Sequence, residues 1–151
     1  MEQMKKKIYI LNGPNLNMLG VREPQHYGKT SYNELAQELC QYCSERGAEA
    51  VVYQSNHEGD LVDMIQKAYY DSACGIVINP AAYTHTSIAI LDAVKAVSLP
   101  TVEVHISDVN SREDFRKTSY IRAACIATVS GHGIKGYFEA VDIILEATKC
   151  E

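Results

Sequence analysis

The sequence predicts an α/β protein built on a five-stranded parallel sheet with helices on both faces. Five short apolar runs, each suited to a strand, alternate with helical patterns from one end of the chain to the other. The runs are continuously apolar, as expected of strands that are buried on both faces. Five such units in 151 residues indicate a flavodoxin-like, doubly wound fold. The runs are residues 8–11, 50–53, 75–79, 101–105 and 125–129.

The segments between these runs carry apolar residues at helical spacing. The first helical segment begins with a capping box formed by Ser31 and Glu34 and ends before Gly47. The third covers about residues 86–97. No repeat or linker divides the chain, so we expect one domain over residues 1–151. The stripes of the other helices are Leu35, Leu39, Tyr42 and Cys43, then Leu61, Ile65, Ala68 and Tyr69, and finally Tyr137, Val141, Ile144, Leu145 and Thr148.

Composition and charge exclude several functional classes. The net charge is −5 and the only basic run is residues 5–7, so we expect no nucleic-acid partner. No apolar run has the length or flanks of a signal peptide or a membrane span, so we expect a cytoplasmic protein without membrane contact. Five cysteines without framework spacing fit a reducing compartment. Cys40 and Cys43 form a C-x-x-C inside a predicted helix, without the second pair that a zinc site needs.

Polar residues follow the ends of several predicted strands. Asn12, Gln54, Asn79 and His105 each end an apolar run, and Ser107 follows shortly after. In a doubly wound sheet, ligands bind outside the carboxyl ends of the strands. The sequence therefore predicts a site for a small polar ligand at this edge.

A long loop follows the first strand over residues 12–28 and is rich in Gly, Pro and Asn. Loops of this length are typically lids or binding loops, and we expect an active-site lid at about residues 19–29. Arg22 and Tyr27 lie five positions apart within it. A guanidinium close to a phenol favours the phenolate, which would let Tyr27 act as a base at neutral pH. A surface loop with an incidental tyrosine is the alternative.

Glu103 and His105 lie two positions apart on one predicted strand, so their side chains share a face. A carboxylate beside an imidazole fixes the imidazole tautomer and raises its pKa, as a general acid requires. A buried histidine with a purely structural role is the alternative.

Two further groups are candidates for anion binding. Residues 83–87 open the third helix, where backbone N–H groups and hydroxyls favour an anion, although Thr84 or Thr86 acting only as a cap is the alternative. Arg112 and Arg116 are spaced one helical turn apart, and Arg suits bidentate recognition of carboxylates and hydroxyls. Their alternative role is a solvated helix face.

The residues Gly131 to Gly136 match the dinucleotide-binding pattern G-x-G-x-x-G. That fold needs another parallel strand beyond the helix, and only 15 residues follow Gly136. We expect these glycines to let the last helix pack close to the sheet. The chain also lacks a P-loop, a nucleophile elbow, a metal-type His cluster and a lysine inside an apolar strand. We therefore expect an enzyme that uses no cofactor and no metal.

Together these motifs closely resemble type II 3-dehydroquinate dehydratase (type II dehydroquinase), over about residues 8–137. That family carries G-x-G-x-x-G at this end without binding a dinucleotide. The matching blocks are Asn12-Gly-Pro-Asn-Leu-Asn17, Gly20-x-Arg22-x-Pro24-x-x-Tyr27-Gly28, Gln54-Ser-Asn-x-Glu58-Gly59, Asn79-Pro-x-x-x-Thr-His85-Thr-Ser, Asp92, Glu103-x-His105-Ile-Ser107, Arg112-x-x-Phe115-Arg116 and Gly131-x-Gly-x-x-Gly-Tyr137.

The resemblance implies anti elimination of water from 3-dehydroquinate through an enolate, giving 3-dehydroshikimate in the shikimate pathway of aromatic amino acid biosynthesis. It implies that Tyr27 is the phenolate base and that Arg22 keeps its pKa low. A water on Asn12 would stabilise the enolate, and His105, oriented by Glu103, would protonate the departing C1 hydroxyl.

The same resemblance implies a set of substrate-binding residues and an oligomer. Asn79, the backbone of Ile106 and the Ser107 hydroxyl would hold the substrate carboxylate. His85 and Arg116 would contact the ring hydroxyls, Arg112 would belong to the mobile lid region, and Asp92 would reach the active site of a neighbouring subunit. The last role implies trimers assembled into a dodecamer.

Four positions depart from the family pattern, and none is assigned a catalytic role. Asp108 stands where Asn is common, Thr118 replaces a frequent His, and Ala127 and His132 replace a common Gly and Leu. Three alternatives remain at this stage. They are a flavodoxin-like binding domain without chemistry, the same fold acting on another cyclic hydroxy acid, and the same reaction serving quinate breakdown.

Overall fold

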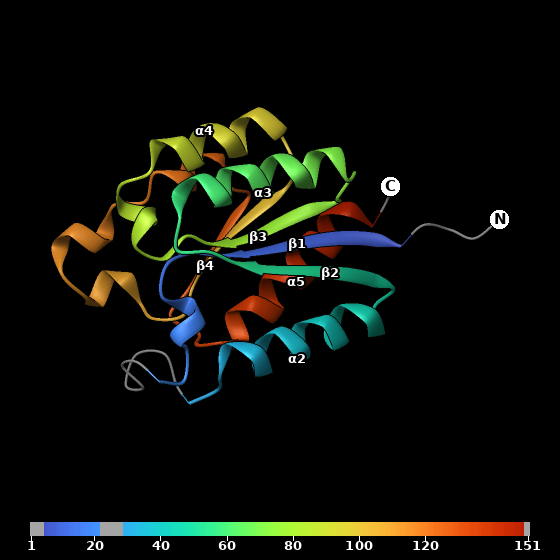
Figure 1. The fold of residues 1–151 in the computed structure, drawn as a ribbon, viewed down its shortest axis with the longest axis horizontal. Helices are drawn as coiled ribbons and strands as arrows, with labels where there is room; N and C mark the ends of the chain where they lie inside the picture. Colours follow the sequence, from blue (N-terminus) through green and yellow to red (C-terminus); the bar gives the residue numbers. More distant parts are fainter. Residues whose placement is uncertain (1–4, 22–28, 150–151) are drawn as a thin grey trace.

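The computed structural model describes residues 5–21 and 29–149, which form a three-layer α/β arrangement. The five strands are all parallel and lie in the order β2-β1-β3-β4-β5. Helices α3 and α4 cover one face of the sheet, and α2 and α5 cover the other (Figure 1). The strands are Lys6–Asn12, Ala48–Gln54, Gly75–Asn79, Thr101–His105 and Ala127–Ser130, and the helices α2 to α5 are Tyr32–Glu45, Glu58–Tyr70, Ile88–Val97 and Lys135–Thr148.

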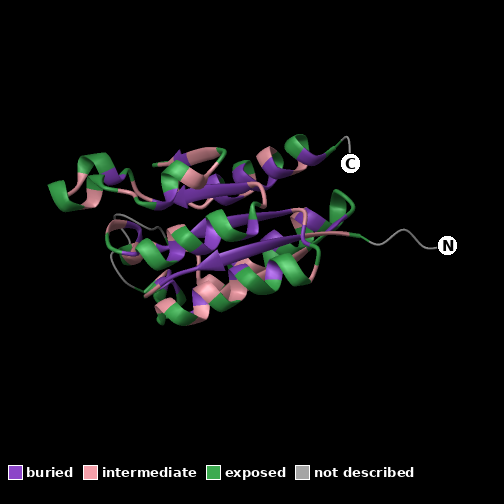
Figure 2. Cartoon of the chain, turned by 90° about the horizontal axis from the view of Figure 1, so that it is seen from above, coloured by how far each residue is buried: buried purple, intermediate pink, exposed green. Residues whose placement is uncertain are grey.

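The two faces of the sheet bury separate apolar layers. Ile8 and Ile10 point toward α2 and α5, whereas Tyr9 and Leu11 point toward α3 and α4, because successive side chains of a strand alternate between faces. Figure 2 shows the strands buried and the outer sides of the helices exposed. The strands are therefore covered on both faces, as their continuously apolar pattern predicted.

Local capping residues decide where the helices begin. Ser31 caps α2 by accepting a hydrogen bond from the Glu34 backbone N–H at 3.1 Å, as the capping box predicted. The predicted start of the third helix at Thr86 was wrong. Ser87 caps α4, since its Oγ accepts from the Ile90 N–H at 3.0 Å, and residues Ala81–His85 form a separate 3₁₀ helix, η2. Neither Thr84 nor Thr86 is the cap.

The connection between β4 and β5 consists of three short 3₁₀ helices. These are η3 (Val109–Ser111), η4 (Asp114–Lys117) and η5 (Ile121–Ala124). The predicted strand at residues 125–129 begins two residues later, because Cys125 ends η5 before β5 starts to pair with β4. Figure 1 shows η3 and η4 in orange, projecting beyond the end of the sheet.

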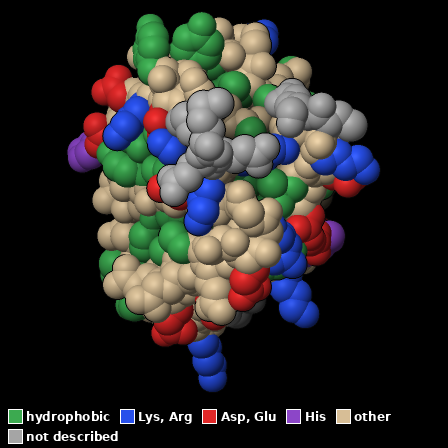
Figure 3. Space-filling model, turned by 90° about the vertical axis from the view of Figure 1, so that its right-hand side faces the viewer, with side chains coloured by type: hydrophobic (Ala, Val, Ile, Leu, Met, Phe, Trp, Pro, Cys, Tyr) green, Lys and Arg blue, Asp and Glu red, His purple; other side chains and the backbone are tan. Residues whose placement is uncertain are grey.

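Over residues 5–21 and 29–149, no helix combines the length and the hydropathy that crossing a membrane requires. On the face seen in Figure 3, Lys and Arg side chains are interspersed with Asp and Glu and form no continuous basic surface.

Candidate active site

A pocket of about 130 Å³ opens at the carboxyl ends of β1, β3 and β4. This is the edge that strand topology predicted, beside the point where the strand order reverses. Seven of the predicted site residues line it: Asn79, His85, His105, Ile106, Ser107, Arg112 and Arg116. Arg22, Tyr27 and residues 22–28 of the expected lid lie outside the described residues.

The pocket is lined by two arginines and two histidines, and by no carboxylate among the described residues. This charge pattern favours an anionic ligand. The end of β2 contributes no lining residue, contrary to the expectation that four strand ends would meet there. Gln54 instead donates from Nε2 to the Gly13 carbonyl at 3.1 Å and so supports the loop that follows β1.

Gly13 allows the loops after β1 and β3 to meet. Its N–H donates to the Asn79 carbonyl at 2.8 Å, and a Cβ at this position would lie 2.3 Å from the Pro80 carbonyl oxygen. No side chain fits at that distance. A glycine here is therefore required for Asn79 to stand beside the end of β1.

Asn12 and Asn79 are joined beneath the pocket by the hydroxyl of Tyr137. This hydroxyl donates to Asn12 Oδ1 at 2.7 Å and accepts from Asn79 Nδ2 at 3.0 Å. Tyr137 is fully buried, which raises the pKa of its phenol and keeps it a neutral donor. Asn12 also donates to the Tyr53 carbonyl and is hydrogen-bonded to Tyr32. Asn12 lies beneath the pocket and is not among its lining residues.

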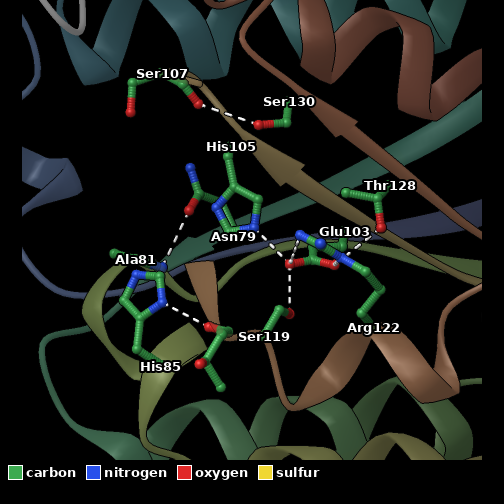
Figure 4. Close-up of polar contacts among 11 residues, drawn as sticks. Asn79, Ala81, His85, Glu103, His105, Ser107, Ser119, Arg122, Thr128 and Ser130 are labelled. Atoms are coloured by element: carbon green, nitrogen blue, oxygen red, sulfur yellow. Dashed lines mark hydrogen bonds and ion pairs between the residues drawn. The ribbon is translucent and has the colours of Figure 1, made fainter. Parts of the chain in front are cut away.

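His105 lines the pocket and forms a buried pair with Glu103, which does not line it (Figure 4). His105 Nε2 donates to Glu103 Oε2 at 2.5 Å, which leaves Nδ1 as the other ring nitrogen available to a ligand. Glu103 is fully buried and His105 is 5% exposed. The expected carboxylate–imidazole pair is therefore present.

Three further side chains bind the Glu103 carboxylate. Ser119 Oγ donates to Oε2 at 2.7 Å, Thr128 Oγ1 donates to Oε1 at 3.0 Å, and Arg122 contacts both oxygens. Burial by itself would raise the pKa of Glu103, but the hydrogen bonds from His105, Arg122 and Ser119 outweigh it and lower the pKa to about 2. Glu103 is therefore a carboxylate throughout the physiological range.

The His85 ring is held by a hydrogen bond to the backbone carbonyl of Thr118. Its Nδ1 lies 2.7 Å from the Thr118 carbonyl, which can only accept, so Nδ1 carries the proton and Nε2 is an acceptor in the neutral ring. Burial lowers the pKa of His85, and the nearby His105 and Arg116 lower it further. Because Thr118 acts through its backbone carbonyl, its side chain makes no contribution to this bond.

Arg112 and Arg116 do not share a helix face, and the solvated-face alternative is wrong. Arg112 ends η3 in an extended conformation, whereas Arg116 lies in η4, and both are half-buried in the pocket wall. Arg116 Nε donates to Glu113 Oε2 at 2.7 Å. The pocket thus receives two guanidiniums from consecutive short turns.

Neither Asp108 nor Asp92 lines the pocket, although the chain neighbours of Asp108, Ser107 and Val109, do. Asp108 Oδ1 accepts from the Asn110 N–H at 3.0 Å and so caps η3, which explains its role without any contact to a ligand. Asp92 is exposed on α4.

Residues 131–134 form the turn between β5 and α5, Gly136 lies in the first turn of α5, and no described strand follows that helix. Gly131 and Gly133 have φ of 83° and 63° and donate to the His105 and Ile106 carbonyls at 3.2 and 3.0 Å. A Cβ on Gly136 would lie 3.2 Å from Val129 Cγ1, so the expected close packing of α5 is confirmed. The turn supports the end of β4.

Within residues 5–21 and 29–149, no three His, Cys, Asp or Glu side chains gather as a metal site would require.

Comparison with known proteins agrees with this geometry. The family model described as Dehydroquinase class II matches residues 6–145. The chain belongs to the class II dehydroquinase family. The predicted resemblance and the flavodoxin-like fold class are therefore confirmed.

Individual members of this family align with nearly the whole chain. A "3-dehydroquinate dehydratase" from Caldicellulosiruptor saccharolyticus is 50% identical over 93% of this chain and 97% of its own length. A "Catabolic 3-dehydroquinase" from Debaryomyces hansenii is 46% identical over 94% and 99%. The crystal structure of type II dehydroquinase from Butyrivibrio crossotus superimposes with a TM-score of 0.91 at 48% identity, covering 93% of this chain and 97% of that one.

Sequence reasoning missed the partners of Glu103 and the hydroxyl role of Tyr137. A carboxylate inside an apolar strand was a signal, because a buried charge needs a cation and hydrogen bonds. That signal showed that partners must exist, but it did not identify them as Arg122, Ser119 and Thr128. Tyr137 was named in an apolar stripe and in a matching family block, but its hydroxyl was given no role, although a buried phenol usually finds a hydrogen-bond partner.

Proposed function

We propose that this chain catalyses the anti elimination of water from 3-dehydroquinate to give 3-dehydroshikimate, without a metal or an organic cofactor. The observation that carries the proposal is the buried Glu103–His105 pair beside a pocket lined by cations and amides. Relatives named 3-dehydroquinate dehydratase, about 50% identical over nearly the whole chain, support the same reaction.

Asn79 and Ser107 bind the substrate carboxylate in this proposal. Asn79 Oδ1 already accepts from the Ala81 N–H at 3.1 Å, and one Nδ2 hydrogen goes to Tyr137. The second Nδ2 hydrogen remains a donor, as does the Ser107 hydroxyl. Together with the Ile106 N–H they offer three neutral donors to one carboxylate.

Acid and base lie on different segments in the proposed reaction. Tyr27, ionised with the help of Arg22, removes a C2 proton and leaves an enolate. Asn12 Oδ1 has a second lone pair that can hold a water, and that water donates its other hydrogen to the enolate oxygen. His105, oriented by Glu103, then gives its proton to the departing C1 hydroxyl.

His85 and Arg116 contact the ring hydroxyls in this scheme. His85 Nε2 accepts and Arg116 donates, so the pair distinguishes a hydroxylated ring from an apolar one. Arg112 is also a substrate-binding residue in this scheme and belongs to the lid region, whose loop we place at about residues 19–29. We take residues 1–151 to form the single domain that carries this pocket.

The decisive experiment adds 3-dehydroquinate to the purified protein and follows the ultraviolet absorbance of the conjugated enone carboxylate that forms. The protein is assayed with and without borohydride pretreatment. A rise that survives borohydride supports the dehydratase and excludes a lysine imine. Binding of 3-dehydroquinate without turnover would support instead a flavodoxin-like binding domain, and neither binding nor turnover would indicate another cyclic hydroxy acid.

Asp92 reaches the active site of a neighbouring subunit in our proposal, within trimers assembled into a dodecamer. This accounts for an exposed carboxylate on α4 that the single chain leaves outside the pocket. Asp92→Ala and Tyr27→Phe proteins should each be inactive when assembled alone. Mixed trimers should regain activity, because one subunit supplies Tyr27 and the other Asp92. No recovery in verified mixed trimers would contradict a shared site.

We place the enzyme in the cytoplasm and in aromatic amino acid biosynthesis. The relative named a catabolic 3-dehydroquinase, at 46% identity, keeps quinate breakdown as a second role. Deleting the gene separates the two. Loss of growth without aromatic amino acids supports the biosynthetic role, and loss of growth only on quinate supports the catabolic one.

A further inference from the structure

Arg122 contacts the buried carboxylate of the proposed acid pair from the side opposite the pocket. Its Nε lies 3.0 Å from Glu103 Oε1 and its Nη2 lies 3.4 Å from Oε2. Oε2 is also the oxygen that accepts from His105 at 2.5 Å. We propose that Arg122 is a positioning residue that sets how readily the Glu103–His105 pair releases its proton, a role that rests on the proposed dehydratase function.

The contact joins a surface residue to the interior. The Arg122 side chain, in η5, is 41% exposed, whereas the Glu103 carboxylate is fully buried. Figure 4 shows Arg122 and His105 reaching the carboxylate together with Ser119 and Thr128. Of these four partners, Arg122 alone carries a charge that does not titrate at neutral pH.

Charge arithmetic gives the expected direction. With Arg122 present, the three groups carry a net charge of +1 when His105 is protonated and zero when it is not. Without Arg122 the corresponding charges are zero and −1, so the buried carboxylate would hold the imidazolium proton more tightly. Arg122 therefore makes His105 a stronger acid toward the departing hydroxyl.

Other charged groups near His105 remain in place when Arg122 is changed. His85, Arg112 and Arg116 line the pocket on the substrate side. Cys125, on the Arg122 side, has its pKa raised to about 12 by burial and by the Glu103 charge, with Arg122 opposing. The thiol is therefore neutral at the assay pH.

The test compares the pH dependence of turnover in wild-type protein, Arg122→Gln and Arg122→Lys. A general acid must be protonated, so its ionisation gives the falling limb of the profile at high pH. In Arg122→Gln we expect this limb to move to higher pH by about one unit, with kcat reduced and KM unchanged. Arg122→Lys keeps the charge, and its limb should stay within about 0.3 unit of wild type.

Arg46→Gln is the matched control. Arg46 is 38% exposed, similar to Arg122, and it contacts Asp142 and the Tyr42 ring on the surface beside α2. The pH profile of turnover in this variant should match that of the wild type.

An NMR titration of the His105 ring, assigned with a His105→Asn variant, reports the same shift without turnover. This readout remains if the wild-type protein fails to dehydrate 3-dehydroquinate, so the two failures are distinguishable.

An unchanged falling limb and an unchanged His105 titration in folded Arg122→Gln would overturn the proposal. If that variant does not fold, Glu103→Gln is compared with the double variant Glu103→Gln/Arg122→Gln, in which no buried carboxylate is left unpaired. His105 should then titrate at higher pH in the double variant. Identical titrations in these two proteins would also refute the role of Arg122.

Discussion

Replacing Tyr137 with Phe should weaken both the fold and the reaction, because one hydroxyl holds two amides of the site. The hydroxyl donates to Asn12 at 2.7 Å and accepts from Asn79 at 3.0 Å, and the tyrosine is fully buried. Each lost bond costs about 1 kcal/mol, and the unsatisfied buried groups raise the total to about 2–4 kcal/mol. For a chain of this length that corresponds to a fall in Tm of roughly 5–12 °C.

Turnover should fall as well, because the freed amides are able to rotate away from the substrate. If one hydrogen bond worth about 1 kcal/mol is lost in the transition state, kcat/KM falls about fivefold. The assay is the formation of enone from 3-dehydroquinate, with Tm measured at the same protein concentration, since assembly also affects Tm.

Tyr9→Phe is the matched control for this variant. Tyr9 is 1% exposed, and its hydroxyl donates to Asp71 at 2.6 Å, at the opposite end of the sheet from the pocket. This variant should lose stability and keep kcat/KM within about twofold of wild type. The reasoning fails if Tyr137→Phe retains wild-type kcat/KM, or if Tyr9→Phe loses as much activity as Tyr137→Phe.

Three other predictions follow from the proposed roles. Tyr27→Phe should abolish turnover while substrate binding, measured by calorimetry, stays largely intact, and normal turnover would remove Tyr27 as the base. The folded-state pKa of Glu103 is about 2, below its ordinary 4.5, so its stabilisation is present above about pH 5 and is lost as pH falls toward about 2. Urea unfolding should therefore show a loss near 3 kcal/mol over that range in wild type that Glu103→Gln lacks, and equal pH dependence would refute the assignment. Asp108→Asn should keep kcat/KM within about twofold, because either side chain can cap η3, and a larger change would mean that the Asp108 charge acts on the site.

Local sequence signals were sufficient for most of the fold. The apolar runs and the Ser31 capping box predicted the strands and α2, since strand burial and helix capping depend on neighbouring residues. The third helix and the last strand were predicted two residues early. In both places a 3₁₀ helix intervenes, and its short turns leave no periodic pattern to detect.

The sequence by itself determined the class of site, because the ends of parallel strands meet at one edge of a doubly wound sheet. This rule was enough to place Asn79 and His105 at one pocket. The tertiary structure alone decided which side chains hold these groups. Tyr137 is 125 positions from Asn12, and Arg122 is 19 positions from Glu103, and no local pattern links either pair. Such partners are selected when helices pack on the sheet and each buried polar group must find a hydrogen bond.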